Sequence, residues 1–445
     1  MKLWEKGIET NKLVEQFTVG KDRELDLLLA EADILGTLAH IRMLESIGLL
    51  TNNELKILVH ELINIHKSVH NSNFIIEESV EDIHSQIEIL LTNALGDLGK
   101  KIHSGRSRND QVLVDIKLFA RAQIAEVAHL TKVVFDTLIL LSEEHKKNLM
   151  PGYTHLQVAM PSSFGLWFGA YAESLTDDLI LLQAAYKITN QNPLGSAAGY
   201  GSSFPLNRTM TTELLGFDDL NYNVIYAQMG RGKTEKIIAF AISSIGATLA
   251  KLSMDICLFM NQNFGFINFP EEFTTGSSIM PHKKNPDVFE LIRAKGNRLQ
   301  ALPNEIALIT ANLPSGYHRD MQLIKECFFP AFDDIKTCLS LANMMLKHIE
   351  ISANIIDDPD YLYIFSVEEV NKMVLEGIPF RDAYKKVANE IKNGSFMPQK
   401  ELRHTHEGSI GNLCNNKIKN KMNKIYNSFY FEKTEKVIKN LLKEI

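Results

Sequence analysis

The feature that most constrains the fold is a long stretch, residues 108–150, which contains neither glycine nor proline. Its apolar residues recur at helical spacing, so it predicts one helix of roughly 60 Å at 1.5 Å per residue. A helix of that length is stable only when neighbours of matching length pack against it. The segment therefore predicts a bundle of long helices, within one chain or shared between chains.

Other segments support the same architecture. Residues 235–261 are apolar on most faces, as in a helix buried among other helices. Residues 161–192 and 288–313 also show helical patterns, the second interrupted at Pro303. We expect a mainly α fold of three helical domains whose central bundle of long helices is compatible with a multi-helix core shared between subunits. The expected boundaries are 1–105 for an N-terminal helical domain, 106–355 for the long-helix bundle, and 356–445 for a small C-terminal helical domain.

Composition excludes several classes of protein. The net charge of −7 argues against a nucleic-acid binder that relies on general positive charge. The four cysteines lack metal-ligand spacing, which favours reduced thiols. The first residues lack the apolar run of a signal peptide, and the longest uncharged apolar stretch, residues 237–250, is too short to span a bilayer. We therefore expect a cytoplasmic protein with neither a membrane nor a nucleic acid as partner.

The stretch with the most chemistry is residues 275–286, which read Thr-Gly-Ser-Ser-Ile-Met-Pro-His-Lys-Lys-Asn-Pro. Its prolines and glycine predict an irregular loop, and a helix start follows at Asp287. Lysines beside a helix N-terminus favour binding of a carboxylate. The pattern Gly-Ser-Ser-x-Met-Pro-x-Lys-x-Asn-Pro resembles the signature loop of the fumarase/aspartase superfamily. We call residues 275–286 the signature loop.

A second stretch, residues 103–112, reads His-Ser-Gly-Arg-Ser-Arg-Asn-Asp-Gln-Val. Either Asn109 or Asp110 can cap the following helix, and the donors beside that N-terminus suit a carboxylate clamp or a solvated basic turn equally well. The stretch resembles the corresponding loop of the argininosuccinate lyases. That resemblance implies that Ser107, Arg108 and Asn109, which we call the clamp, contact the substrate. The glycine-rich segment 193–208 lacks a P-loop ending and predicts a tight turn packed near the site.

Two more blocks resemble the same family. Residues 152–157, Gly-Tyr-Thr-His-Leu-Gln, match a superfamily block, which implies that Thr154 contacts substrate and that His155 is catalytic. Histidine suits this role because its pKa lies near neutrality. Residues 317–326 match Tyr-x-x-Asp-x-Gln-x-x-Lys-Glu. The implied substrate contacts there are Tyr317, Gln322 and Lys325.

The resemblance implies cleavage of argininosuccinate to arginine and fumarate by β-elimination across a C–N bond. Loss of the proton concentrates negative charge on a carboxylate, which the ammonium of Lys283 and the amide of Asn285 are expected to hold. Either Ser277 or His155 removes the proton, and Glu290 occupies the position of the glutamate that holds the histidine. In the superfamily each site combines blocks from three subunits of a homotetramer. The resemblance therefore implies a homotetramer with shared active sites, in which the central bundles form the multi-helix core. The chemistry requires only proton transfer and charge stabilisation, so no metal or cofactor is expected.

Two other functions compete with this hypothesis. One is another fumarate-releasing lyase of the superfamily, such as adenylosuccinate lyase, which offering both substrates would distinguish. The other is a non-catalytic, crystallin-like structural protein, which loss of a catalytic residue would support. The sequence retains the residues that catalysis needs, which are His155, Ser277, Lys283 and Glu290.

Overall fold

The long helix predicted from residue 108 dominates the computed structural model, which describes residues 11–71 and 73–444. Helix α7, Arg108–Glu144, has 37 residues, which corresponds to about 55 Å. It ends six residues before the expected Met150, because residues 149–163 form a β-hairpin instead. The strands of this hairpin are β1, Leu149–Thr154, and β2, Gln157–Ser163.

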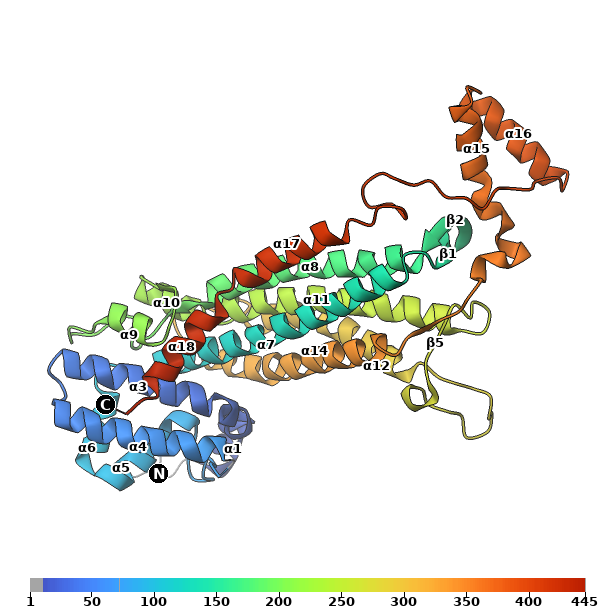
Figure 1. The fold of residues 1–445 in the computed structure, drawn as a ribbon. Coiled ribbons are helices and arrows are strands. Elements are labelled where there is room, and N and C mark those ends of the chain that lie inside the picture. Colours follow the sequence, from blue (N-terminus) through green and yellow to red (C-terminus); the bar gives the residue numbers. More distant parts are fainter. Residues whose placement is uncertain (1–10, 72, 445) are drawn as a thin grey trace.

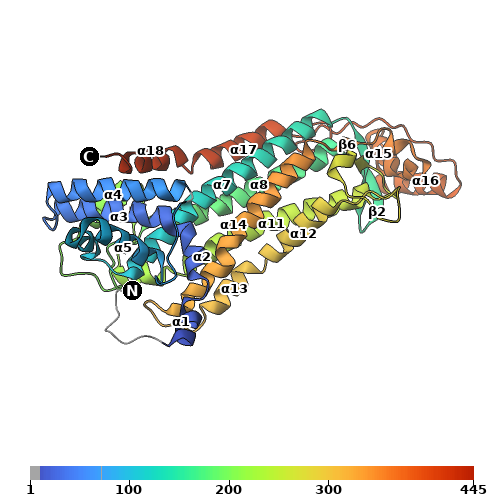
Figure 2. The ribbon, with the colours of Figure 1, turned by 90° about the horizontal axis from the view of Figure 1, so that it is seen from below.

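Helix α7 packs in a bundle of long helices that run along one axis (Figures 1 and 2). It contacts α8 and α14, while α11 contacts α8, α12, α13 and α14. The other bundle helices are α8, Phe164–Thr189; α11, Lys233–Met260; α12, Asp287–Leu299; α13, Leu302–Ile309; and α14, Ile324–Leu346. The predicted mainly α fold is thus confirmed, and Pro303 lies in the first turn of α13, where proline is tolerated.

Helices α11 and α12 lie close together at two glycines, Gly246 and Gly296. A Cβ atom on Gly296 would overlap the carbonyl oxygen of Gly246, so Gly296 has no room for a side chain, and a Cβ atom on Gly246 would be tightly packed. Helix α11 is also long and apolar enough to cross a membrane by length and composition, and 61% of its apolar window is buried inside the protein. Its packing against four other helices accounts for that composition without a bilayer.

The N-terminal helices lie at one end of the bundle, where α3 packs against α7 (Figure 1). Helices α3, Ala30–Ser46, and α4, Asn52–His70, pack against each other, and a capping box at Thr51 starts the second. The remaining elements of this end are α1, Lys12–Val19; α2, Asp22–Asp26; η1, Leu27–Leu29; α5, Ile83–Leu95; α6, Asp97–Lys100; and η2, Lys101–His103.

The C-terminal residues occupy two places. Helices α15, Ser366–Leu375, and α16, Phe380–Lys392, form a small lobe with its own core around Val370 and Val387. The chain then returns along the bundle as α17, Asn415–Asn427, on α8, and α18, Phe431–Leu441, beside α3 (Figure 1). The three-domain division stays a prediction, and residues 356–445 are divided in space between lobe and bundle.

Short elements connect these parts. Strand β3 pairs in parallel with β4, and β5 pairs with β6 antiparallel. Their bounds and those of the remaining elements are β3, Gln191–Asn192; α9, Arg208–Leu214; β4, Asp219–Leu220; α10, Val224–Met229; β5, Ile267–Asn268; η3, Glu271–Phe273; η4, Arg319–Leu323; β6, Glu350–Ile351; η5, Ile355–Asp357; and η6, Pro359–Phe365.

Candidate active site

The clamp lies at the N-terminus of α7. Ser107 is the N-cap residue, and its Oγ accepts the N–H of Asn109 at 3.3 Å. The Ser107 N–H donates to Asp110 Oδ1 at 2.8 Å, which completes a capping box. The prediction that Asn109 or Asp110 is the N-cap residue was therefore wrong, because Ser107 is the N-cap residue. The half-buried Asn109 side chain forms no hydrogen bond within the described residues and is available to a ligand.

Arg108 is held in place by the start of α5. Its Nη1 donates to Asp82 Oδ2 at 2.9 Å, and its Nη2 donates to Ser85 Oγ at 2.7 Å. Glu81 lies between two guanidinium groups, 3.5 Å from Arg108 and 2.9 Å from Arg319. These contacts fix the orientation of the Arg108 side chain, and Glu81 links the clamp to the segment that begins at Tyr317.

Asp110 ties the clamp to the glycine-rich segment 193–208. Its Oδ2 accepts the backbone N–H groups of Gly195 at 3.0 Å and Ala197 at 2.9 Å. Burial raises the pKa of Asp110 to about 6, although these N–H donors favour the charged form. The prediction that the glycine-rich segment packs near the site is confirmed. The role of Asp110 was not predicted, although the Ser-x-x-Asp spacing of a capping box is visible in the sequence.

Two of the substrate contacts implied in residues 317–325 are bonded within the chain. Gln322 Nε2 donates to the carbonyl oxygens of Thr18 at 3.0 Å and Val19 at 3.1 Å. Lys325 Nζ is buried and lies 2.6 Å from Asp22 and 2.7 Å from Asp26. Tyr317, in contrast, is 39% exposed.

The Lys325 ammonium lies between the buried carboxylate of Asp26 and the half-buried carboxylate of Asp22. They raise the pKa of Lys325 although its burial lowers it. Burial raises the pKa of Asp22 to about 6 although the Lys325 ammonium lowers it, and the negative charge of Asp26 adds a smaller rise. The ammonium therefore stays charged, and its charge is already balanced inside the chain.

His155 lies at the tip of the β1–β2 hairpin. The strands end at the pair Thr154 and Gln157, so His155 and Leu156 form a two-residue loop. Both have positive φ, 56° and 59°, as a type I′ turn requires. Residues with a side chain rarely adopt this conformation, and such strain is concentrated at functional sites. The turn holds the imidazole in an exposed position, and the adjacent Thr154 is also exposed.

The signature loop is closed at its base by backbone pairing. The N–H of Asn285 donates to the carbonyl oxygen of Thr275 at 2.8 Å, and the Asn285 side chain donates to the Gly276 carbonyl at 3.4 Å. Within the loop, the half-buried Ser277 accepts the N–H of Met280 at 3.1 Å through its Oγ. Lys283 is exposed, and so is Glu290 in the first turn of α12, which starts at Asp287 as predicted.

The candidate residues fall into two groups at opposite ends of the bundle. The clamp and residues 317–325 lie at the end with α1 and α2, whereas the hairpin and the signature loop lie at the other end (Figure 2). Helix α7 separates Arg108 from the hairpin by about 55 Å. Within the described residues, no hydrogen bond or ion pair joins His155 to Ser277, Lys283 or Glu290. One chain therefore presents two separate groups of candidate residues, which we call the candidate half-sites.

Known proteins resemble this chain over its whole length. A family model described as a lyase matches residues 5–300. The argininosuccinate lyases of Bacteroides fragilis and Parabacteroides distasonis are each 63% identical over 441 residues, which cover 99% of this chain and 99% of each relative. The argininosuccinate lyase of Thermotoga neapolitana is 38% identical over 389 residues, 87% of this chain and 98% of the relative.

Solved structures share the fold. EDDS lyase in complex with formate superposes with a TM-score of 0.76 at 20% identity, covering 98% of this chain and 94% of its own. The class II fumarase from Schistosoma mansoni gives a TM-score of 0.69 at 15% identity, covering 85% and 88%. The sequence relationships over nearly the full length go further than the shared fold, and they agree with the signature loop and the clamp. The chain belongs to the argininosuccinate lyase family of the fumarase/aspartase superfamily.

Proposed function

We propose that this protein cleaves argininosuccinate to arginine and fumarate, the last step of arginine biosynthesis, and that it acts in the cytoplasm. The observation that carries the proposal is the 63% identity to argininosuccinate lyases over 99% of the chain. The four residues with proposed catalytic roles are all present, and His155 occupies a strained, exposed turn.

The elimination needs a base and a stabilised carboxylate. We propose that Lys283 and Asn285 hold the carboxylate next to the carbon that loses its proton, because negative charge develops there. Ser277 or His155 takes the proton, and Glu290 orients the histidine. Thr154 contacts the substrate beside the imidazole. Closure of the signature loop over the bound substrate would exclude water, and the exposed Ser278 and Lys283 are consistent with an open loop in the free chain.

The clamp is proposed to bind the other part of the substrate. Ser107 supports the helix N-terminus, Arg108 supplies a fixed cation, and Asn109 offers an unbonded amide. The proposed substrate contacts also include Tyr317, which is exposed, and Gln322 and Lys325, which follow it closely in the sequence. Gln322 and Lys325 are bonded within the chain, so we propose that they shape the wall of the site and reach substrate through their remaining bonding capacity.

A complete site would need more than one chain. A small substrate cannot bridge the candidate half-sites, which are separated by about 55 Å along α7. We propose a homotetramer in which the clamp of one chain meets the hairpin and the signature loop of others, as dihedral symmetry permits for antiparallel bundles. Exposed apolar side chains support this arrangement, because contacts between chains would bury them. Leu156 in the hairpin turn is 79% exposed and Ile279 in the signature loop is 82% exposed in the single chain.

One assay tests the proposed function. The purified protein is mixed with argininosuccinate or with adenylosuccinate, and fumarate is followed by its ultraviolet absorbance while arginine is measured separately. Equal amounts of arginine and fumarate from argininosuccinate are the expected result. Fumarate from adenylosuccinate alone would favour the other lyase, and no turnover of either substrate would favour a structural protein.

A further inference from the structure

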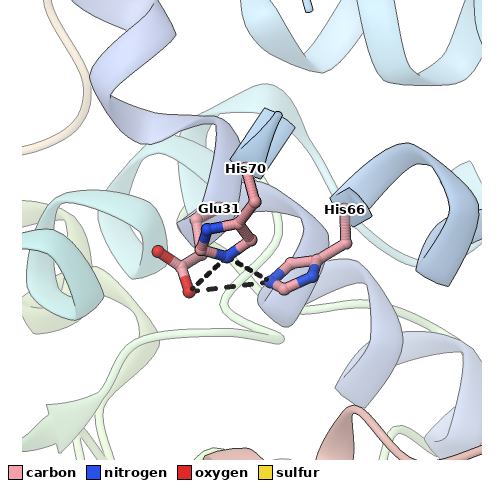
Figure 3. Close-up of side chains that lie close together, drawn as sticks. All are labelled: Glu31, His66 and His70. Atoms are coloured by element: carbon pink, nitrogen blue, oxygen red, sulfur yellow. Dashed lines mark hydrogen bonds and ion pairs between the residues drawn. The ribbon is translucent and has the colours of Figure 1, made fainter. Parts of the chain in front are cut away.

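The surface of the N-terminal helices carries a cluster of two histidines and one glutamate that plays no part in the proposed reaction. Glu31 lies in the first turn of α3, while His66 and His70 lie in the last turns of α4 (Figure 3). Since His66 and His70 are four residues apart, both rings lie on one face of α4. The packing of α3 against α4 brings the carboxylate to that face.

The three side chains point one atom each toward a common centre (Figure 3). The two Nε2 atoms of His66 and His70 lie 3.2 Å apart. Oε1 of Glu31 lies 3.6 Å from each of them. A triangle with these sides has a centre about 2.0 Å from every corner, which matches the Zn–N and Zn–O distances of protein zinc sites. The donor set is thus already placed at coordination distance.

The charges of the cluster also suit a cation. Glu31 forms ion pairs only with these two histidines, and within the described residues no lysine or arginine neutralises it. Two imidazoles and one carboxylate are ligands that Zn²⁺ accepts readily.

A second cluster of possible metal ligands differs from the first, because its charges are balanced by other side chains of the protein. Asp33, His84 and Asp115 are fully buried, and His84 makes a short contact with Asp33. Burial raises the pKa of Asp33, but the charge and hydrogen bond of His84 and, to a smaller extent, the guanidinium of Arg106 hold this pKa below its ordinary value. This cluster is therefore already balanced by an internal cation, whereas the Glu31 cluster is open to solvent on one side.

We propose that Glu31, His66 and His70 form a binding site for a divalent transition-metal ion such as Zn²⁺, with water completing the coordination. The ion would join the start of α3 to the end of α4 and stabilise the folded protein by binding to it alone. None of the three ligands belongs to the proposed active site, so the fumarate-releasing reaction proceeds with or without the ion.

The test measures Zn²⁺ binding by the full-length protein after its affinity tag has been removed and its metals have been stripped with a chelator. Zinc is titrated in competition with a chromophoric chelator of micromolar affinity. The unmodified protein is expected to bind one more zinc ion per chain than His66→Ala/His70→Ala. Glu31→Gln, which keeps the shape of the side chain and removes its charge, is expected to lower the affinity at least about tenfold, since even outer-shell changes cost that much.

The matched control is His60→Ala, because His60 is an exposed histidine of the same helix that pairs with Glu444 outside the cluster. It should bind zinc as the unmodified protein does, and zinc should raise the melting temperature of both. Circular dichroism without metal checks that the variants fold. Equal zinc uptake by the unmodified protein and His66→Ala/His70→Ala, no uptake by either, or an equal loss in His60→Ala would overturn the proposal.

Discussion

The two candidate half-sites differ in how much of their geometry one chain provides. At the clamp, Arg108 is fixed by Asp82 and Ser85, and Asp110 is buried under two backbone N–H groups. At the other end, His155 and Lys283 are exposed and held mainly by the turns that carry them. We infer that the side chains proposed to bind substrate at the clamp are positioned within one chain, whereas the proposed catalytic residues at the other end are positioned by contacts between chains.

The largest expected effect comes from removing the proposed acid and base. Ser277→Ala and His155→Ala should each lower kcat by about 10³-fold or more while the proteins remain folded. The measurement is steady-state fumarate release, with circular dichroism as the check on folding. Ser278→Ala is the matched control, because this neighbouring serine is exposed in the same loop and should keep most of the activity. Near-normal fumarate release by Ser277→Ala would contradict the assignment.

At the clamp end, the next largest effect should appear in stability. Lys325→Met leaves the buried Asp26 and the half-buried Asp22 without their cation, which should cost about 3–5 kcal/mol of unfolding free energy in chemical denaturation. Lys336→Met on the same helix is the control, since its partner Glu126 is exposed, and it should cost less than about 1 kcal/mol. If Lys325→Met lowers the unfolding free energy as little as Lys336→Met does, the charges around Lys325 do not stabilise this end of the bundle, and the prediction is wrong.

A smaller effect is expected from Arg108→Lys. The lysine keeps the charge but cannot donate to Asp82 and Ser85 with a rigid fork, so the cation becomes mobile. We expect KM for argininosuccinate to rise about tenfold with a smaller change in kcat. Arg403→Lys, on the exposed surface of the C-terminal part, should leave both constants unchanged. An unchanged KM for Arg108→Lys would remove the clamp from substrate binding.

The smallest effect concerns pH. Burial raises the pKa of Asp110 to about 6, above its ordinary 3.8, so the folded state binds a proton that the unfolded state releases between these values. Stability from this group therefore falls as pH rises through 6. Relative to Asp110→Asn, the unmodified protein should gain about 1 kcal/mol of unfolding free energy from pH 7 to pH 5. A pH-independent difference between the two would contradict this assignment.

The sequence predicted the long helices well because periodicity and the absence of glycine and proline are local signals. It placed the end of α7 six residues too late, since residues 145–150 carry no helix breaker. In the structure the helix ends in a turn over residues 145–147, and β1 begins at Leu149. The turn at His155 was not predicted either, because its positive φ occurs at a residue that usually avoids it.

Contacts between residues far apart in the sequence could not be predicted from local sequence patterns. Gln322 and Lys325 were expected to face a substrate, yet their partners Thr18, Asp22 and Asp26 lie about 300 positions earlier in the chain. No spacing in residues 317–326 signals such contacts. The motifs predicted which residues form the site, and only the structure shows that α7 separates these residues into two groups at opposite ends of the bundle (Figure 2). The roles of the individual site residues stay predictions.

The central claim is that clamp and imidazole act together only when they come from different chains. Mixing inactive His155→Ala and Arg108→Ala chains, unfolding them together and refolding them, tests this most directly. If each site combines these residues from two chains, random assembly restores about one quarter of the sites, and activity should recover to that level. If the mixture stays as inactive as the separate variants, both residues belong to one chain's site and the account is contradicted.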